Sequence, residues 1–234
     1  MYKIYLSPSN QPHNRYIVGN TNEKIQMEAV AKKVKEILDR EYECETVMAT
    51  LYLDIDANGR AKEAKDKGCH IYLAIHSNAG GGGSSSGAVA FYHPDSLNGK
   101  KLATNVVKEL NTICPIKSNR STPVENGMKA FSGMGYGEIR NPSKLGLISV
   151  LVETDFHDNP KTAQWIIDNK EDIARAYVSA LVSTFNIPKK RYKSDVENQK
   201  FYRVQVGAFT KNENAKALIK KLKQAGFDGY IKYD

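Results

Sequence analysis

The stretch HIYLAIHS, residues 70–77, decides the fold class because it is an almost unbroken apolar run of strand length. A strand with one face in water alternates apolar and polar side chains, whereas a strand buried on both faces reads as a continuous apolar run. The stretch GLISVLVE, residues 146–153, has the same character. Two such runs predict a sheet whose faces are both covered by helices.

Helical patterns separate these apolar runs. From Met27 to Leu38, apolar side chains recur at the spacing of one helix face, which predicts a helix over about residues 22–42. Strands that alternate with helices predict an α/β fold, with a twisted and mostly parallel sheet flanked by helices. Residues 115–145 are expected to be irregular. Further strands are expected at residues 3–6, 44–50 and 88–93, and further helices at residues 54–68, 96–113 and 159–185.

A proline and a charge cluster interrupt this pattern near the C-terminus. We therefore expect a large domain over residues 1–187, a linker over residues 188–199 and a small β-α-β unit over residues 200–234. The chain has 34 basic and 26 acidic residues. From Ile187 onward there are 12 basic and 5 acidic residues, so this tail carries a net charge of +7 and the rest of the chain +1. A cationic tail on a nearly neutral body indicates an anionic partner, such as nucleic acid or bacterial wall polymer.

Composition narrows the class of protein. No apolar run approaches the roughly 20 residues that a membrane helix needs, so no membrane partner is expected. The N-terminal stretch MYKIYLSPSN has no readable signal peptide, and synthesis in the cytoplasm is expected. The glycine run at residues 80–83 lacks the Lys-Ser/Thr of a phosphate loop. The three cysteines are isolated in the sequence, which indicates free thiols and not disulfides or a cysteine zinc site. They are Cys44, Cys69 and Cys114.

Polar side chains follow the ends of the predicted core strands. His13 follows the first strand, while His76 and Glu153 end the two apolar runs. In an open α/β sheet, ligands bind outside the carboxyl ends of the strands, and Glu28, in the second turn of the first helix, can return to that edge. Two histidines and a carboxylate suit a catalytic zinc site, and a second carboxylate can then move protons. This pattern predicts hydrolysis of an amide or an ester.

Each of these residues also has a simpler interpretation. Glu28 lies four residues before Lys32, the spacing of a surface ion pair. His13 suits a solvated loop, and His76 suits a hydrogen-bonded strand end. Glu153 is harder to explain without a function, because burying a carboxylate after an apolar run is costly. The histidines that we interpret as structural are His70, His93 and His157.

Four motifs together resemble the zinc-dependent N-acetylmuramoyl-L-alanine amidases of the Amidase_3 family. In chain order they are SPSNQPHN, QMEAVAKKV, IHSNA and LVETDF. The resemblance covers residues 2–187, and it implies that His13, Glu28 and His76 bind Zn²⁺ and that Glu153 is the catalytic glutamate. The form SPSNQ resembles clostridial phage lysins, whereas GEIR stands where the family usually has a more apolar segment.

This resemblance implies cleavage of the amide bond between N-acetylmuramic acid and L-alanine in bacterial peptidoglycan. A phage or prophage endolysin, made in the host cytoplasm and released onto the wall, is the leading interpretation. The alternatives are a host autolysin or sporulation amidase of the same chemistry, and a wall-binding protein without catalysis. A nucleic-acid binder would need a recognition motif, which the chain does not offer.

The tail resembles the first half of a SPOR domain, a module that binds glycan strands stripped of their peptides. A full SPOR domain repeats the β-α-β pattern twice, whereas residues 200–234 contain it once. We therefore expect the tail to bind the cell wall. Our hypothesis is that two copies associate through this unit, so that a homodimer builds one complete SPOR-like surface.

Overall fold

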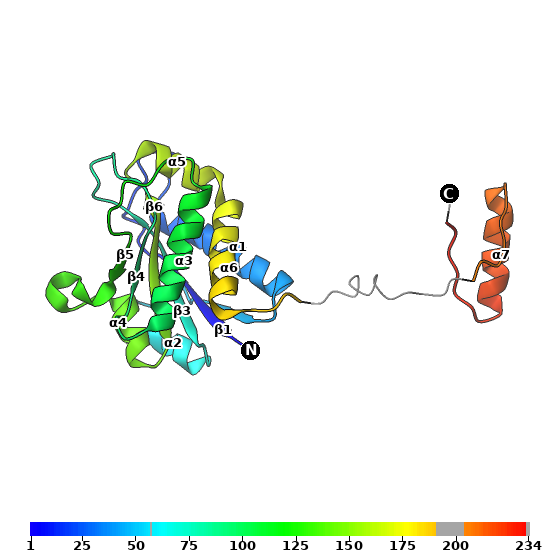
Figure 1. Ribbon diagram of the computed structural model, residues 1–234, viewed down its shortest axis with the longest axis horizontal. Coiled ribbons are helices and arrows are strands. Elements are labelled where there is room, and N and C mark those ends of the chain that lie inside the picture. The colour runs from blue at the N-terminus through cyan, green and yellow to red at the C-terminus, as the bar shows by residue number, and fades with distance from the viewer. Residues whose placement is uncertain (57, 191–203, 233–234) are drawn as a thin grey trace. The chain divides into compact units, whose positions relative to one another are not determined.

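The computed structural model describes residues 1–56, 58–190 and 204–232 (Figure 1). The chain divides into two compact units, Met1–Lys190 and Arg191–Asp234. Most of the predicted linker, residues 191–199, lies outside the described residues. In the described part of the chain, no helix is both long and apolar enough to cross a lipid bilayer.

The first unit is built on one six-stranded sheet with the strand order β2-β1-β3-β6-β4-β5. All neighbouring strands are parallel except β4 and β6, which run antiparallel. The predicted fold class, a mostly parallel sheet flanked by helices, is confirmed. The strands are β1 (Lys3–Pro8), β2 (Glu45–Met48), β3 (Ile71–Asn78), β4 (Val89–Tyr92), β5 (Val124–Asn126) and β6 (Ile148–Phe156).

Helices cover both faces of the sheet (Figure 1). One face packs against α1 (Glu23–Glu41), α3 (Leu97–Ile113) and α6 (Lys170–Phe185), with the short α5 (Pro160–Asp168) beside them. The other face packs against α2 (Arg60–Asp66) and α4 (Gly137–Lys144). Two short 3₁₀ turns, Gly127–Lys129 and Phe131–Gly133, precede α4.

Strand β3 shows how this two-sided core follows from the sequence. Successive side chains of a strand point to opposite faces. Ile71, Leu73 and Ile75 belong to the core under α1, α3 and α6, whereas Tyr72 and Ala74 belong to the core under α2 and α4. Because both faces are buried, the strand carries no polar residue until His76, and the interpretation of this run as a doubly covered strand is correct.

Two local predictions need correction. The helix expected over residues 159–185 is divided at Asn169, whose backbone (φ −117°, ψ 35°) leaves the helical region, so that α5 and α6 are separate helices. The segment expected to be irregular, residues 115–145, contains β5 and α4. Helix α4 carries Pro142 in its interior, a residue that argues against a helix in any sequence pattern.

Among the described residues of the second unit, one helix forms, α7 (Asn212–Gln224), as expected for the middle of the predicted β-α-β unit. The flanking strands of the predicted β-α-β unit do not form within residues 204–232. A strand is stable only when its backbone groups pair with a neighbour. Large apolar side chains are exposed instead, among them Val204, Val206, Phe227 and Ile231.

Candidate active site

A row of side chains crosses the sheet at the carboxyl ends of its central strands. His76 of β3 is in register with Glu153 of β6, and Glu153 is in register with Val89 of β4. Side chains at paired positions point to the same face, here the face covered by α2 and α4. The structure therefore brings His76 and Glu153 together at the edge where the fold class predicts a ligand site.

His76 lies between two carboxylates. Its Nδ1 atom is 2.9 Å from Oε1 of Glu23, and its Nε2 atom is 2.7 Å from Oε2 of Glu138. All three side chains are buried. Burial opposes a charge on the imidazole, but Glu138 and Glu23 outweigh that effect and raise the pKa of His76 well above 6.5. Both ring nitrogens then donate hydrogen bonds, which fixes the orientation of the ring.

Glu23 reaches this position from the first turn of α1. The helix begins after Asn22, whose side chain accepts a hydrogen bond from the Ile25 N–H at 3.0 Å. The Glu23 carboxylate accepts hydrogen bonds from Asn14 Nδ2 at 2.7 Å and from the Ser77 N–H at 3.2 Å. Burial alone would raise the pKa of Glu23, but the contact with His76 and the hydrogen bonds from Asn14 and Ser9 lower it. The carboxylate is thus held ionised beside His76.

Glu138 reaches His76 from the opposite side, on α4. Its carboxylate accepts hydrogen bonds from Ser7 Oγ at 2.5 Å and from the Tyr72 hydroxyl at 2.9 Å. The wholly buried Arg60 donates from Nη1 to Ser7 Oγ at 2.9 Å. Burial would raise the pKa of Glu138, but His76 and Ser7 lower it. A buried polar network therefore holds this carboxylate in place.

Glu153 differs from the other two carboxylates. The residue is partly exposed, yet its Oε2 atom is buried and has no hydrogen-bond partner among the described residues. Burial raises the pKa of Glu153 to about 7, because the opposing effect of His76 is offset by repulsion from Glu23 and Glu138. A carboxyl group with a pKa near neutrality can both accept and return a proton, which is the requirement for a general acid and base.

The two other residues expected at this site make no hydrogen bond or ion pair with His76 in the described structure. His13 is exposed in the loop after β1, and among the described residues no hydrogen bond or ion pair joins it to His76. Glu28 forms the i,i+4 ion pair with Lys32, Oε1 to Nζ at 2.6 Å. The structure therefore does not bring Glu28 to His76, and Glu23 occupies that position.

Sequence reasoning missed Glu23 and Glu138, and only one of them left a clear signal. Glu23 follows the helix cap directly, so its side chain returns to the sheet edge more readily than one from the second turn. The spacing of Asn20 and Glu23 predicts a cap at Asn20, whereas the cap in the structure is Asn22. Glu138 lies in GEIR, the segment that departs from the family pattern, and nothing in the sequence connects it to His76.

A sequence model of the N-acetylmuramoyl-L-alanine amidase family, Amidase_3, matches residues 7–183, and a SPOR domain model matches residues 169–233. The chain is 24% identical over 234 residues to a sporulation-specific N-acetylmuramoyl-L-alanine amidase of Bacillus subtilis. That alignment covers 99% of this chain and 84% of the relative.

Solved structures show the same fold. The catalytic domain of CwlV, an N-acetylmuramoyl-L-alanine amidase of Bacillus (Paenibacillus) polymyxa, superposes with a TM-score of 0.65 at 19% identity, over 80% of this chain and 100% of that chain. An N-acetylmuramoyl-L-alanine amidase of Clostridium difficile superposes with a TM-score of 0.63 at 21% identity, over 79% and 97%. Since the family match extends over most of its length, the chain belongs to the N-acetylmuramoyl-L-alanine amidase family and is a peptidoglycan amidase.

Proposed function

We propose that this protein hydrolyses the amide bond between N-acetylmuramic acid and L-alanine, with Glu153 as the general acid and base. The observation that carries the proposal is the pairing of His76 with Glu153 at the carboxyl edge of the sheet. A buried carboxyl oxygen without a partner, on a group with its pKa near 7, suits proton transfer at neutral pH.

The chemistry of the donor set fits Zn²⁺, although no group of three or more His, Cys, Asp or Glu side chains in the described ranges is arranged to hold a metal. One imidazole contacts two carboxylates, and Glu153, its register partner on the next strand, has a buried oxygen with no hydrogen-bond partner among the described residues. Such an excess of oxygen donors around one histidine favours a divalent cation. Glu23 and His76 would hold it, and His13 remains our proposal for the third ligand. When bound, zinc would supply Lewis-acid chemistry for the scissile carbonyl and the attacking water.

The side chains of this chain have separable roles in the reaction. Glu153 accepts a proton from the attacking water and delivers it to the nitrogen of the leaving L-alanine. Glu138 orients the His76 ring at Nε2, so that Nδ1, which lies beside Glu23, would be the nitrogen that faces the metal. The network of Ser7 and Tyr72 keeps Glu138 in position, so that the ring does not rotate during turnover.

Incubation of the full chain with purified peptidoglycan tests this function. We expect new N-terminal L-alanine to appear without new reducing sugar ends, and a chelator to abolish the release. New reducing ends in place of alanine N-termini would show that the protein is a glycosidase and would refute the proposal. Release that persists in the chelator-treated protein would refute the zinc requirement.

For the second unit, we propose binding to peptidoglycan glycan strands. The match to a SPOR model and the cationic character of the tail support this role. Homodimerisation through residues 200–234 remains part of the proposal, because the exposed apolar side chains around α7 need a second surface.

The biological setting separates two candidates with the same chemistry. We propose a wall amidase of the bacterium itself, since a relative aligned with nearly the whole chain is sporulation-specific. The phage endolysin made in the host cytoplasm stays a prediction. Expression timed to sporulation would favour the first candidate, whereas a holin gene beside this one would favour the second.

A further inference from the structure

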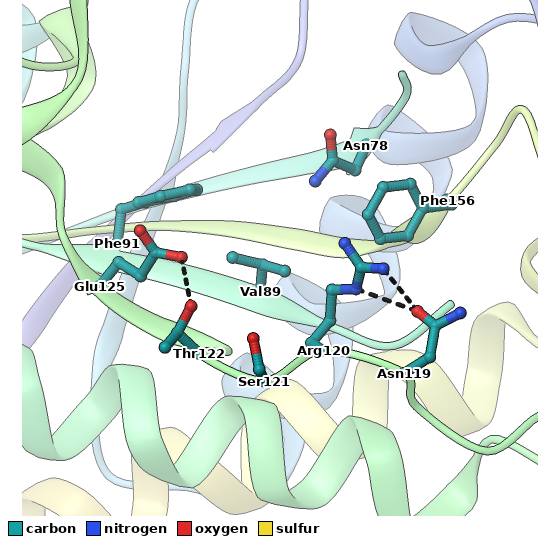
Figure 2. A pocket seen from close by; sticks show the side chains of 9 residues that line it. All are labelled: Asn78, Val89, Phe91, Asn119, Arg120, Ser121, Thr122, Glu125 and Phe156. Carbon is teal, nitrogen blue, oxygen red and sulfur yellow. Dashed lines mark hydrogen bonds between the residues drawn. The ribbon is translucent and has the colours of Figure 1, made fainter. Parts of the chain in front are cut away.

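A pocket of about 270 Å³ opens beside Glu153 on the same face of the sheet (Figure 2). Val89, which is paired with Glu153, forms part of its wall, and Phe91 follows on the same side of β4. The pocket therefore includes part of β4, the strand next to the one that carries Glu153. Its remaining lining residues are Asn78, Asn119, Arg120, Ser121, Thr122, Glu125 and Phe156.

Arg120 brings a fixed positive charge to one end of this pocket. Its Nη2 atom donates to Asn119 Oδ1 at 2.6 Å and to Ser85 Oγ at 3.1 Å, and its Nε atom donates to Asn119 Oδ1 at 3.1 Å. The guanidinium lies 5.0 Å from the ring centroid of Phe156. All of these partners are neutral, and within residues 1–56, 58–190 and 204–232 no carboxylate forms an ion pair with Arg120. The side chain is thus positioned but its charge is not compensated.

Glu125 brings the opposite charge to the other end of the pocket. Its Oε1 atom accepts a hydrogen bond from Thr122 Oγ1 at 3.1 Å. Figure 2 shows Arg120 and Glu125 on opposite sides of Val89, with Phe91 next to Glu125. The pocket therefore offers a cation, an apolar floor and an anion in sequence, which suits an extended ligand that carries both charges.

We propose that this pocket binds the stem peptide of the substrate, with Arg120 taking the free α-carboxylate of the D-glutamate that follows L-alanine. Glu125 takes the side-chain ammonium of the diamino acid that comes next. The inference rests on the proposed function, because only the peptide part of a muramoyl peptide carries such charges. Because Nε and Nη2 of Arg120 already donate to Asn119 and Ser85, its Nη1 would donate to the ligand carboxylate, and such a charge-assisted hydrogen bond discriminates against the uncharged amide. The pocket would thus make the enzyme prefer stems whose D-glutamate is not amidated.

Binding of two matched peptides to the full chain tests the assignment without turnover. The probes are L-alanyl-γ-D-glutamyl-diaminopimelate and the same tripeptide with D-isoglutamine, measured by titration calorimetry. A hydrogen bond to a charged group contributes about 1.5–3 kcal/mol, or about 10–150-fold in affinity. We expect the wild type to bind the carboxylate peptide more tightly by this factor, and Arg120→Gln to lose the preference. Lys117→Gln, at an exposed position outside the pocket lining, is the matched control and should retain it.

A second variant checks the other end of the pocket. Glu125→Gln should weaken binding of the peptide with a free side-chain amine and leave unchanged that of a peptide whose amine is acetylated. Equal affinity of wild type and Arg120→Gln for the carboxylate peptide would overturn the inference. An equal loss for both the carboxylate and the amide peptide in Arg120→Gln would also overturn it, because it would indicate a structural role only.

Hydrolysis assays distinguish this inference from the proposed function. If peptidoglycan releases alanine N-termini while Arg120→Gln leaves the preference for D-glutamate over D-isoglutamine unchanged, the function stands and the peptide pocket is refuted. If the peptide preference depends on Arg120 while no alanine N-termini appear, the pocket stands and the proposed reaction is refuted.

Discussion

The Nε2 atom of His76 lies 2.7 Å from Oε2 of Glu138, a carboxylate that comes from the segment where the sequence departs from its family. Partners of this kind orient a metal-binding histidine, and their loss typically costs 10–100-fold in metal affinity or activity. We predict that Glu138→Gln lowers kcat by about that factor with little change in KM, because the contact acts on the ring and not on the substrate. Steady-state kinetics on a soluble muramoyl peptide would measure it.

Ser7→Ala provides a graded comparison for Glu138. It removes the hydroxyl that donates to Glu138 at 2.5 Å but retains the carboxylate, so its effect on kcat should be smaller than that of Glu138→Gln. Circular dichroism should show both variants folded. A Glu138→Gln enzyme with the turnover of the wild type would contradict the positioning role.

Glu153→Gln should keep the shape of the site and lose its proton chemistry. General acid and base catalysis contributes about 10²–10⁴-fold, so we expect kcat to fall by that factor while the protein stays folded. Because Oε2 of Glu153 has no hydrogen-bond partner in the described structure, the substitution breaks no existing bond at that atom. Unchanged turnover in this variant would rule out Glu153 as the acid and base.

Glu23 and Glu28 form a matched pair on one helix. We predict that Glu23→Gln lowers zinc content and activity sharply, since Glu23 contacts His76. Glu28→Gln should remove only the ion pair with Lys32, worth about 0.2–0.5 kcal/mol, and leave zinc content unchanged. Atomic absorption on the two purified variants decides between them, and a normal zinc content in Glu23→Gln would restore Glu28 as the candidate ligand.

The sequence predicts the sheet well because two-sided burial leaves a direct trace in runs such as residues 70–77 and 146–153. His76 and Glu153 are predicted for the same reason, as polar groups at the ends of those runs. Glu138 is not predictable in this way. Its contact with His76 depends on how α4 packs on the sheet, and no local pattern records that packing.

Glu63 of α2, which is not part of the active site, makes the free energy of unfolding depend on pH. Burial opposes its charge, but hydrogen bonds from Lys67, Thr50 and Tyr5 lower the pKa of Glu63 to about 2. A carboxyl group whose pKa is depressed in the folded state stabilises the fold above its unfolded pKa of about 4.5 and loses that contribution as the pH falls toward 2. The contribution should be about 1–2 kcal/mol after allowance for screening by solvent.

Glu63→Gln should therefore unfold more easily than the wild type at pH 7, and the difference should shrink between pH 4.5 and 2. Urea denaturation at a series of pH values measures this difference. Glu45→Gln, which removes an exposed ion pair with Lys3, is the control and should change stability little at any pH. A constant difference for Glu63→Gln across this range would contradict the depressed pKa.

The small size of the second unit bears on the oligomeric state of the protein. Domains below roughly 40 residues rarely fold without a further source of stability, and α7 has no buried side chain of its own. Val204, Phe227 and Tyr230 are exposed, although burying such side chains is favourable. We predict that a second copy of this unit covers them, so that the full chain is a dimer.

Light scattering at micromolar concentration, on the full chain and on a version ending at Lys190, measures this association. The shortened version ends at Lys190 and not at Ile187 because Pro188 and Lys190 belong to the first unit. The Pro188 carbonyl accepts a hydrogen bond from the Glu43 N–H, and the Lys190 N–H donates one to the Glu41 carbonyl. The shortened version should be monomeric and retain hydrolysis of soluble muramoyl peptides. If the full chain is also monomeric, dimerisation is refuted and the apolar side chains around α7 must be covered by another surface, of which the glycan strand is the first to test.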